Sequence, residues 1–494
     1  MDAQMIGNTL KKKILDTEKL ARRLEPSTEQ RANWSQQATQ YAEDFLDHIE
    51  KNKTFEIDKG TGQGLFSQTF GEAAKPMADL LETIRQEVDY PGLNPASGGH
   101  MAYIPGGGVI PTAWGDYLAA ITNRYAGIFY ASPGAVRMEN HLIRWMCQLM
   151  GYPDSALGNL TSGGSIANLI AIATARDAKS IRARDIEHSV IYLTQQIHHS
   201  IQKALRIAGL NEAIIRYIPV DTRFRMDTQA LKAQLAKDSA NGLRPFLLVA
   251  SAGTTDTGAI DPLDELADIA EDQGMWFHVD AAYGGFFILC EEIRKEYSGI
   301  HRSDSITIDP HKGLFLAYGS GAVLIKDVQS LQDTHYYKGN YMQDSLSAIE
   351  EPSPADLSPE LTKHFRGLRM WLPLQLYGLA PFRAALQEKL YLCRYFYQKI
   401  QELGFEVGPE PELSVTIYRY IPKIGSANHF NAQLVEAVKE DGQLFISSTK
   451  IEGVFWLRLA VLCFRTHLYH VDLLLKVLEE SVARLSKTAA YLER

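Results

Sequence analysis

Short β-rich runs alternate with helical runs between about residue 160 and residue 330, and this alternation constrains the fold of the 494-residue chain more than any other feature. The predicted strands are 189–194, 214–218, 246–251, 276–279, 305–308 and 322–325. The predicted helices between them are 165–178, 199–208, 228–236 and 263–272. Such alternation is typical of a parallel sheet with helices on both faces. We therefore predict an α/β fold with a mostly parallel central sheet.

The regions on either side of this alternation have different patterns. Amphipathic spacing predicts helices at 31–51 and 73–88 in the N-terminal part. A long helical run at 381–403 leads into a smaller α+β tail with strand-like segments at 414–420 and 454–459. Because the chain is too long for one ordinary core, we predict three parts. These are an N-terminal helical segment at 1–95, a large α/β domain at 96–378 and a small α+β domain at 379–494.

The charge and cysteine content exclude several classes of protein. A formal net charge of −9 argues against nucleic acid as a partner. We expect neither a membrane span nor a secretory signal, because no apolar run approaches the roughly 20 residues that cross a bilayer. Four cysteines have no CxxC spacing, which favours buried free thiols in a reducing cytoplasm and predicts no metal site. They are Cys147, Cys290, Cys393 and Cys463.

Two predicted strands deliver an amine and a carboxylate to their ends. Lys312 closes the sequence Asp-Pro-His-Lys directly after strand 305–308, and Asp280 directly follows strand 276–279. Pyridoxal phosphate needs a lysine that forms a Schiff base and an acidic group at its pyridine nitrogen. A lysine after a strand is, taken alone, usually a solvated surface charge. The pair instead predicts a pyridoxal phosphate site.

Two further strand ends supply groups of the same kind. The turn Gly163-Gly164-Ser165 precedes helix 165–178, where free N–H groups favour a phosphate, although such a turn can also be a simple helix cap. Its spacing matches neither a Walker loop nor the dinucleotide motif. His198 after strand 189–194 is either a catalytic group, which lies on a cofactor ring or helps with proton transfer, or a solvated histidine at a helix start. Polar groups at one sheet edge are typical of a ligand crevice.

Taken together, these motifs resemble the group II pyridoxal-phosphate-dependent decarboxylases, which include the aromatic amino acid, glutamate and histidine decarboxylases. The resemblance covers residues 95–371, with weaker agreement near 457–466. It implies the fold of the fold type I transferases and a carboxy-lyase activity on an L-amino acid. It also implies a homodimer in which the N-terminal helices embrace the partner, with the active sites near the interface. The segments that carry it are 162–168, 196–204, 253–255, 278–285 and 309–312.

The resemblance assigns a role to each matching residue. Lys312 would hold the cofactor covalently, Asp280 would keep the pyridine nitrogen protonated, and His198 would stack on the ring. The remaining residues would line the ring and the phosphate: Gly163, Gly164, Ser165, Thr254, Ala282, Asp309 and His311. We call these ten residues the predicted cofactor set. In the resembled family a loop tyrosine protonates the substrate carbon, and here Tyr336 fits best, with Tyr341 as the fallback.

Several positions depart from the aromatic decarboxylases and leave the substrate open. Gly313 stands where a tryptophan is usual, and Gly127 stands where an aromatic residue is expected. The possible walls of the substrate pocket are Tyr103, Phe129 and Tyr130. The cations that would instead receive a side-chain carboxylate are His100, Arg124 and Arg137.

Three functions remain open from the sequence. The first is decarboxylation of an L-amino acid, with an aromatic residue preferred and an acidic one, glutamate or aspartate, as the alternative. The second is a pyridoxal-phosphate-dependent aldehyde synthase, against which Tyr336 argues, because a phenylalanine in that place would favour it. The third is a scaffold without catalysis, which the joint presence of Lys312, Asp280 and His198 disfavours.

Overall fold

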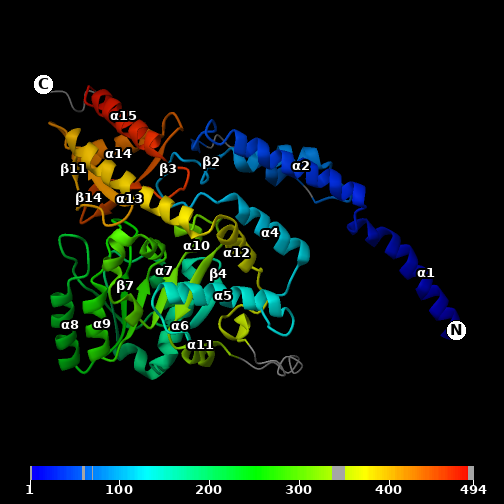
Figure 1. The fold of residues 1–494 in the computed structure, drawn as a ribbon, viewed down its shortest axis with the longest axis horizontal. Coiled ribbons are helices and arrows are strands. Elements are labelled where there is room, and N and C mark those ends of the chain that lie inside the picture. Colours follow the sequence, from blue (N-terminus) through cyan, green and yellow to red (C-terminus); the bar gives the residue numbers. More distant parts are fainter. Residues whose placement is uncertain (1–2, 58–61, 69, 337–350, 488–494) are drawn as a thin grey trace. The chain divides into compact units, whose positions relative to one another are not determined.

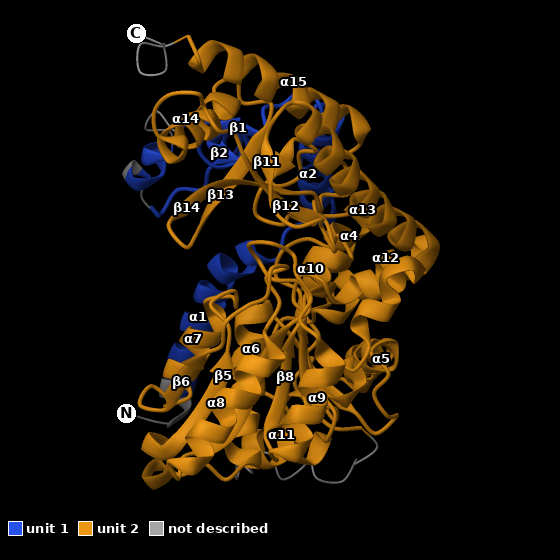
Figure 2. Cartoon of the chain, turned by 90° about the vertical axis from the view of Figure 1, so that its left-hand side faces the viewer, with its two compact units in different colours: residues 1–94 blue, residues 95–494 orange. Residues whose placement is uncertain are grey.

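The computed structural model describes residues 3–57, 62–68, 70–336 and 351–487. The chain divides into two compact units, residues 1–94 and residues 95–494, which are coloured separately in Figure 2. The large unit contains two separate sheets. The predicted boundary between residues 378 and 379 therefore lies inside the second unit, and the three-part division stays a prediction.

The first unit is mainly helical, as the sequence predicts. Its helices are α1 (Ala3–Ala21), α2 (Thr28–Asp47) and α3 (Met77–Ile84), and β1 (Phe55–Glu56) pairs with β2 (Gly92–Leu93) in an antiparallel two-stranded sheet. Helix α2 begins with a capping box, in which Ser27 and Gln30 satisfy each other's backbone N–H groups. Neither α2 nor α3 has a buried residue within this chain.

A seven-stranded sheet forms the centre of the second unit, in the order β4-β10-β9-β8-β7-β5-β6. The strands are β4 (Leu157–Thr161), β5 (Ser189–Leu193), β6 (Ile214–Tyr217), β7 (Arg244–Ser251), β8 (Trp276–Asp280), β9 (Ser305–Ile308) and β10 (Gly321–Ile325). Only β10 pairs antiparallel, with β4 on one side and β9 on the other. The prediction of a mostly parallel sheet is therefore confirmed.

All six predicted strands are present, and β4 is the one that the sequence did not reveal. Its sequence Leu-Gly-Asn-Leu-Thr lacks the β-branched apolar run of the other strands, yet every residue in it is buried. Gly158 is required there, because a Cβ would lie 1.8 Å from the Val323 carbonyl oxygen of β10. Close approach of two strands, which periodicity does not report, explains this strand.

Helices cover both faces of the large sheet (Figure 1). Helices α6 (Gly164–Ala178) and α7 (Ser200–Ile207) pack together on one face, and α8 (Thr228–Ala240) and α9 (Leu263–Asp272) pack together on the other. These four match the predicted helices closely. Further helices of this unit are α4 (Ile110–Thr122), α5 (Pro133–Leu149), α10 (Pro310–Gly313), α11 (Val328–His335) and α12 (Gly367–Tyr377).

A second, smaller sheet has the order β11-β12-β14-β13-β3. Its strands are β3 (His100–Met101), β11 (Glu406–Val407), β12 (Val415–Arg419), β13 (Phe445–Ile451) and β14 (Val454–Ala460). Its helices are α13 (Leu379–Glu402), α14 (Ala427–Lys439) and α15 (Leu468–Leu485). Strand β3 pairs in parallel with β13. A segment from the start of the second unit therefore adds the last strand to a sheet whose other strands come from the C-terminal part of the chain.

Each sheet has its own apolar core. Strands β5, β8, β9 and β10 are buried along their whole length, which explains their nearly continuous apolar sequences. The smaller core gathers side chains of α13, α14, α15 and the second sheet. Across the described ranges, no helix combines the length and the apolar character that crossing a bilayer requires.

Candidate active site

The whole predicted cofactor set lines one cavity of about 280 Å³ in the second unit. The cavity lies where β4, β7 and β8 end, at Thr161, Ser251 and Asp280, and where β9 leads into the segment that carries Lys312. Ligand crevices of open α/β sheets occur at this edge. The fold therefore brings together ten residues that are spread over 150 positions of the sequence.

The predicted phosphate turn contains two glycines, one required by its backbone conformation and one by its close neighbours. Gly163 has a φ of +153°, which side-chain-bearing residues rarely adopt. Gly164 opens α6, and a Cβ on it would lie 3.0 Å from Oδ2 of Asp309. The Thr161 hydroxyl donates to the Gly163 carbonyl at 3.0 Å and fixes the turn to the end of β4. The start of α6 thus faces the cavity with bare backbone, as an anion site requires.

Lys312 is held on the single-turn helix α10. The side chain is 24% exposed, and its Nζ atom lies 3.1 Å from Oδ2 of Asp309. The glycine-rich passage before α4 packs on this helix, because a Cβ at Gly106 would lie 2.2 Å from the His311 carbonyl oxygen. The Val109 N–H also donates to the Phe315 carbonyl at 2.8 Å. Close backbone packing therefore fixes the position from which the lysine enters the cavity.

Asp280 is a buried carboxylate whose two oxygens are separately held. Oδ2 accepts a hydrogen bond from Nδ2 of Asn168 at 3.0 Å, and Oδ1 accepts the backbone N–H of Ala282 at 3.1 Å. Both donors fix the orientation of the carboxylate. Asn168 lies on α6, one turn after the phosphate turn, so the same helix supports both ends of the cavity.

A buried chain of hydrogen bonds fixes the orientation of Asn168. Its Oδ1 lies 3.1 Å from Nε2 of His278, and Nδ1 of His278 lies 2.8 Å from the Ser305 hydroxyl. Burial lowers the pKa of His278 to about 4, so this imidazole is neutral at neutral pH. The Asn168 oxygen can only accept, which assigns the proton of His278 to Nε2. Asn168 was not among the predicted site residues, although its place one turn into α6 was a usable signal.

His198 is half-buried and lines the cavity. Its Nδ1 lies 2.7 Å from the Ser200 hydroxyl, which also accepts Nδ2 of Asn168 at 2.9 Å. Because the hydroxyl accepts from Asn168, its own hydrogen is free to bond Nδ1 of His198, and the ring proton then belongs on Nε2. Burial lowers the pKa of His198, and the charge of Asp280 partly opposes this effect. A neutral ring with a donor edge therefore faces the cavity.

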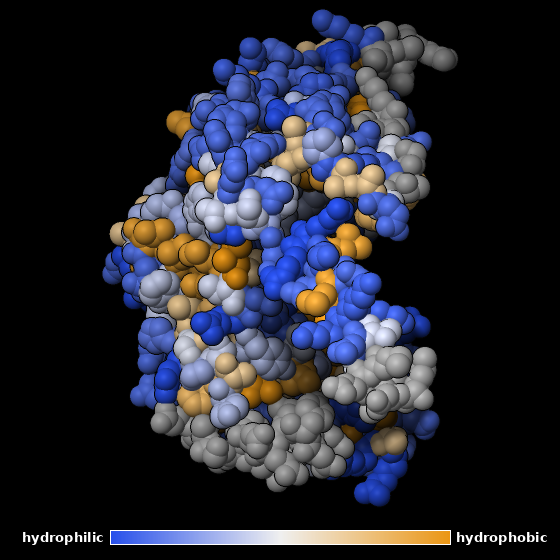
Figure 3. Space-filling view, turned by 90° about the vertical axis from the view of Figure 1, so that its right-hand side faces the viewer, coloured by the Kyte–Doolittle hydropathy of each residue, from blue (hydrophilic) through white to orange (hydrophobic). Residues whose placement is uncertain are grey.

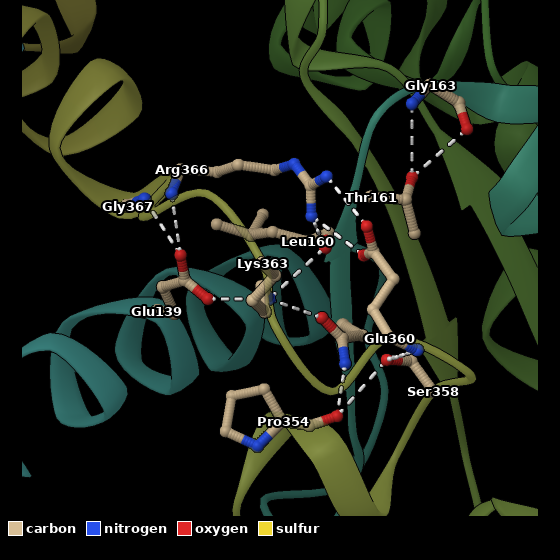
Figure 4. Close-up of polar contacts among 11 residues, drawn as sticks. Glu139, Leu160, Thr161, Gly163, Pro354, Ser358, Glu360, Lys363, Arg366 and Gly367 are labelled. Carbon is tan, nitrogen blue, oxygen red and sulfur yellow. Dashed lines mark hydrogen bonds and ion pairs between the residues drawn. The ribbon is translucent and has the colours of Figure 1, made fainter. Parts of the chain in front are cut away.

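A buried cluster of charged side chains contacts β4 (Figure 4). The Nζ atom of Lys363 donates to Oε2 of Glu139 and to Oδ1 of Asn159, each at 2.8 Å. The other oxygen of Glu139 accepts the backbone N–H groups of Arg366 and Gly367. The cluster ties the segment before α12 to α5 and to β4, which ends at the phosphate turn. It was not predicted, because these residues are far apart in the sequence.

We expect Lys363→Met to lower the free energy of unfolding by about 3–5 kcal/mol, because it leaves the Glu139 carboxylate buried without its cation. Both side chains are at most 2% exposed. Urea denaturation followed by circular dichroism measures the change. Lys399→Met is the matched control, because the Lys399–Glu402 pair is exposed to solvent. A shift for Lys363→Met no larger than that of the control would contradict this role.

Tyr336 and all candidate substrate contacts lie outside the residues that line the cavity. Tyr336 is 52% exposed at the end of α11, and Tyr341 falls outside the described residues. Their roles stay predictions. Of the possible walls, Phe129 is buried, whereas Tyr103 and Tyr130 are exposed elsewhere.

The three candidate cations for a side-chain carboxylate give that alternative no support within this chain. Burial lowers the pKa of His100 to about 4, so it carries no charge at neutral pH. Arg124 and Arg137 are exposed, and the Arg137 guanidinium lies over the Phe129 ring instead. None of the three lines the cavity.

The two glycines that depart from the aromatic decarboxylases have local explanations. A Cβ on Gly313 would lie 2.7 Å from Cβ of Phe286, which fills the space beside α10. A Cβ on Gly127 would lie 2.2 Å from the Leu361 carbonyl oxygen. Packing against Phe286 and Leu361 therefore excludes side chains at both positions, and neither glycine reports directly on the substrate.

Comparisons with known proteins agree with this geometry. Residues 59–421 match the family described as the pyridoxal-dependent decarboxylase conserved domain. An aromatic-L-amino-acid decarboxylase of Bacillus atrophaeus is 32% identical and covers 94% of this chain and 98% of its own. A phenylacetaldehyde synthase of Petunia hybrida is 28% identical, with coverage of 87% and 90%. A crystal structure of Oryza sativa TDC with PLP and tryptamine, 24% identical, has a TM-score of 0.87 and covers 93% of this chain and 99% of its own.

Proposed function

The chain belongs to the pyridoxal-dependent decarboxylase family, and on that premise we propose that it converts an aromatic L-amino acid to its amine and CO2. The observation that carries the proposal is the single cavity in which Lys312, Asp280 and the phosphate turn meet. The relative from Bacillus atrophaeus, which matches nearly the whole chain, supports the aromatic substrate class.

The residues of the cavity fit pyridoxal phosphate. The turn at Gly163–Ser165 offers N–H groups of a helix start to the phosphate, and Gly164 has no room for a side chain. Asp280 at the other end is a buried carboxylate with two fixed donors, suited to a protonated pyridine nitrogen. Ala282 is small enough to leave room for a flat ring, and Lys312 has the amine that bonds an aldehyde.

When bound, pyridoxal phosphate supplies an electron sink that stabilises the negative charge left on the substrate carbon after CO2 departs. The chain's own groups prepare this step. Asp280 holds the proton on the pyridine nitrogen, because an adjacent carboxylate favours the charged ring. The neutral His198 ring lines the same cavity and carries its proton on Nε2.

We assign the protonation of the substrate carbon to Tyr336 or Tyr341, as the family resemblance suggests. A phenol at this point favours the amine product over the aldehyde. The relative from Petunia hybrida is an aldehyde synthase, so that reaction is the alternative with a specific observation behind it. An acidic substrate has less support, because no candidate cation lines the cavity.

A panel of L-amino acids tests the reaction. We expect CO2 and amine in equal amounts from tryptophan, tyrosine or phenylalanine, with a kcat/KM about a hundredfold above those of glutamate and aspartate. Amine, aldehyde and hydrogen peroxide should be measured in the same reaction. If aldehyde and peroxide are the main products, the protein is an aldehyde synthase and the decarboxylase proposal is wrong. If none of the aromatic amino acids is turned over, the proposed substrate class is wrong.

We further propose a cytoplasmic homodimer with active sites near the subunit interface. Helices α2 and α3 have no buried residue within one chain, which suits helices that pack on a partner. Apolar side chains also gather on a face of the molecule shown in Figure 3. Helix α4 supplies exposed apolar residues, each at least 44% exposed: Ile110, Trp114, Tyr117, Leu118 and Ile121.

All four cysteines are free and buried, which agrees with a reducing compartment. Sedimentation velocity and cell fractionation test the two claims.

A further inference from the structure

Asp309 is a second buried carboxylate at the cavity, and its two oxygens have different surroundings. The side chain is 2% exposed. Oδ2 lies 3.1 Å from Nζ of Lys312 and 3.7 Å from Nε2 of His311. Oδ1 is buried without a hydrogen-bond partner among the described residues. A buried carboxylate oxygen with no donor is costly unless a ligand or a proton satisfies it.

The unsatisfied oxygen lies at the wall of the phosphate turn. A Cβ on Gly321 would lie 2.7 Å from Oδ1 of Asp309, and a Cβ on Gly164 would lie 3.4 Å from the same atom. The absence of side chains at these two glycines leaves the carboxylate in direct reach of anything bound at Gly163–Ser165. A phosphate held by the start of α6 would therefore have a carboxylate as its neighbour.

Two anions in contact repel each other, and this repulsion favours the protonated form of one of them. In the free protein Lys312 offsets the charge of Asp309. This cation leaves Asp309 when the lysine amine bonds the cofactor. The proposed function thus creates an uncompensated negative charge beside the phosphate.

His311 offers a second place for a compensating proton. Its Nδ1 lies 2.5 Å from the Ser320 carbonyl oxygen, so Nδ1 carries the hydrogen and Nε2, which faces Asp309, has a free lone pair when the ring is neutral. Burial lowers the pKa of His311, and the positive charges of Lys312 and Arg369 act in the same direction. Asp309 is the charge that opposes them. The charge of Asp309 also raises the pKa of the His198 imidazole, against the effect of burial.

We propose that the Asp309–His311 pair takes up one proton from solvent when the phosphate of the cofactor binds at Gly163–Ser165. The proton resides either on the Asp309 carboxylate or on Nε2 of His311, which lie 3.7 Å apart, and its titration belongs to the pair as a unit. The net charge of the pair rises from −1 to zero, and the phosphate stays a dianion. The inference rests on the proposed function for the place of the cofactor, and it adds that the affinity for the cofactor depends on pH.

Calorimetric titration of the cofactor-free protein with pyridoxal phosphate tests the inference. At pH 8, titrations in two buffers of different ionisation enthalpy give the number of protons taken up. We expect the wild type to take up about one proton more than Asp309→Asn. Between pH 7 and 9, the dissociation constant of the wild type should therefore rise with each pH unit by a factor about tenfold larger than that of Asp309→Asn. Asp309→Asn should bind about tenfold more tightly at pH 8, because the amide donates to the phosphate.

Pyridoxal, which has the ring and aldehyde but no phosphate, separates the causes. We expect the excess of protons that the wild type takes up over Asp309→Asn to be smaller with pyridoxal than with pyridoxal phosphate, because the repulsion by the phosphate is missing. This titration also shows that the variant is folded. Asp256→Asn, which removes a half-buried carboxylate that does not line the cavity, should behave as the wild type. Phosphorus NMR should show a dianionic phosphate.

The outcomes distinguish the two proposals. If pyridoxal phosphate binds the wild type no more tightly than pyridoxal does, the phosphate turn of the proposed function is wrong. If it binds more tightly but wild type and Asp309→Asn take up the same number of protons, only the proton inference is wrong. An equal excess of protons with pyridoxal, or a monoanionic phosphate, also overturns the inference.

Discussion

Lys312→Ala is expected to abolish the visible absorption band of the bound cofactor and to lower kcat/KM for decarboxylation by at least about 10⁴-fold. Among the described residues, Lys312 is the only lysine that lines the cavity, so no other amine described there can bond the cofactor aldehyde. Absorption spectra of the purified proteins and a CO2-release assay measure the two effects. The loss should be larger than for any other single substitution in the cavity.

Lys312→Arg is the matched control for this prediction. A guanidinium keeps the positive charge beside Asp309 but cannot form the covalent bond, because it stays protonated at all relevant pH values. We therefore expect Lys312→Arg to lose the absorption band as completely as Lys312→Ala. An absorption band that persists in either variant would show that a different lysine binds the cofactor.

Asp280→Asn is expected to lower kcat by about 10³-fold while the absorption band remains. The amide keeps the size of the carboxylate but no longer stabilises a positive charge on the pyridine nitrogen, so the electron sink weakens. Lys312 and the phosphate turn are untouched by this change, and the dissociation constant of the cofactor should rise less than tenfold. Steady-state kinetics and equilibrium binding of pyridoxal phosphate separate the two quantities.

Asn168→Ala tests whether Asn168 acts through Asp280. Groups that orient a primary ligand residue typically affect activity by about 10–100-fold, and we expect a loss of that size. In the double variant Asp280→Asn/Asn168→Ala the second substitution should have little further effect, because the contact that it removes serves the carboxylate. Multiplicative losses would show that Asn168 acts independently of Asp280.

The large sheet was predicted well because strands buried on both faces have nearly continuous apolar sequences, which are visible locally. Strands such as β8 and β9 are buried throughout and are read as continuous apolar runs, and the crossover helices follow from their period. Strand β4 and the pairing of β3 with β13 were missed for the opposite reason. Their sequences are short or contain glycine and asparagine, and their partners are distant in the chain.

The residues of the candidate site were predicted from their positions at strand ends and from the family motifs, and all ten of the predicted cofactor set line one cavity. This was possible because parallel strands bring their carboxyl ends to one edge whatever the details of packing. Tyr336 does not line the cavity, because it follows a helix and not a strand end, and Tyr341 lies outside the described residues. The sequence also gave no sign that Phe286 excludes a side chain at Gly313.

The sequence by itself thus determined which chemical groups this protein brings to its site: the amine of Lys312, the carboxylate of Asp280 and a turn for a phosphate. Only the tertiary structure decided how those groups are held. It joined Asn168 to Asp280, placed Lys363 against Glu139 behind β4, and set an unsatisfied oxygen of Asp309 at the phosphate turn. Residue type and local period record the chemistry and the burial of a position, whereas contacts between distant residues arise only when the chain is packed.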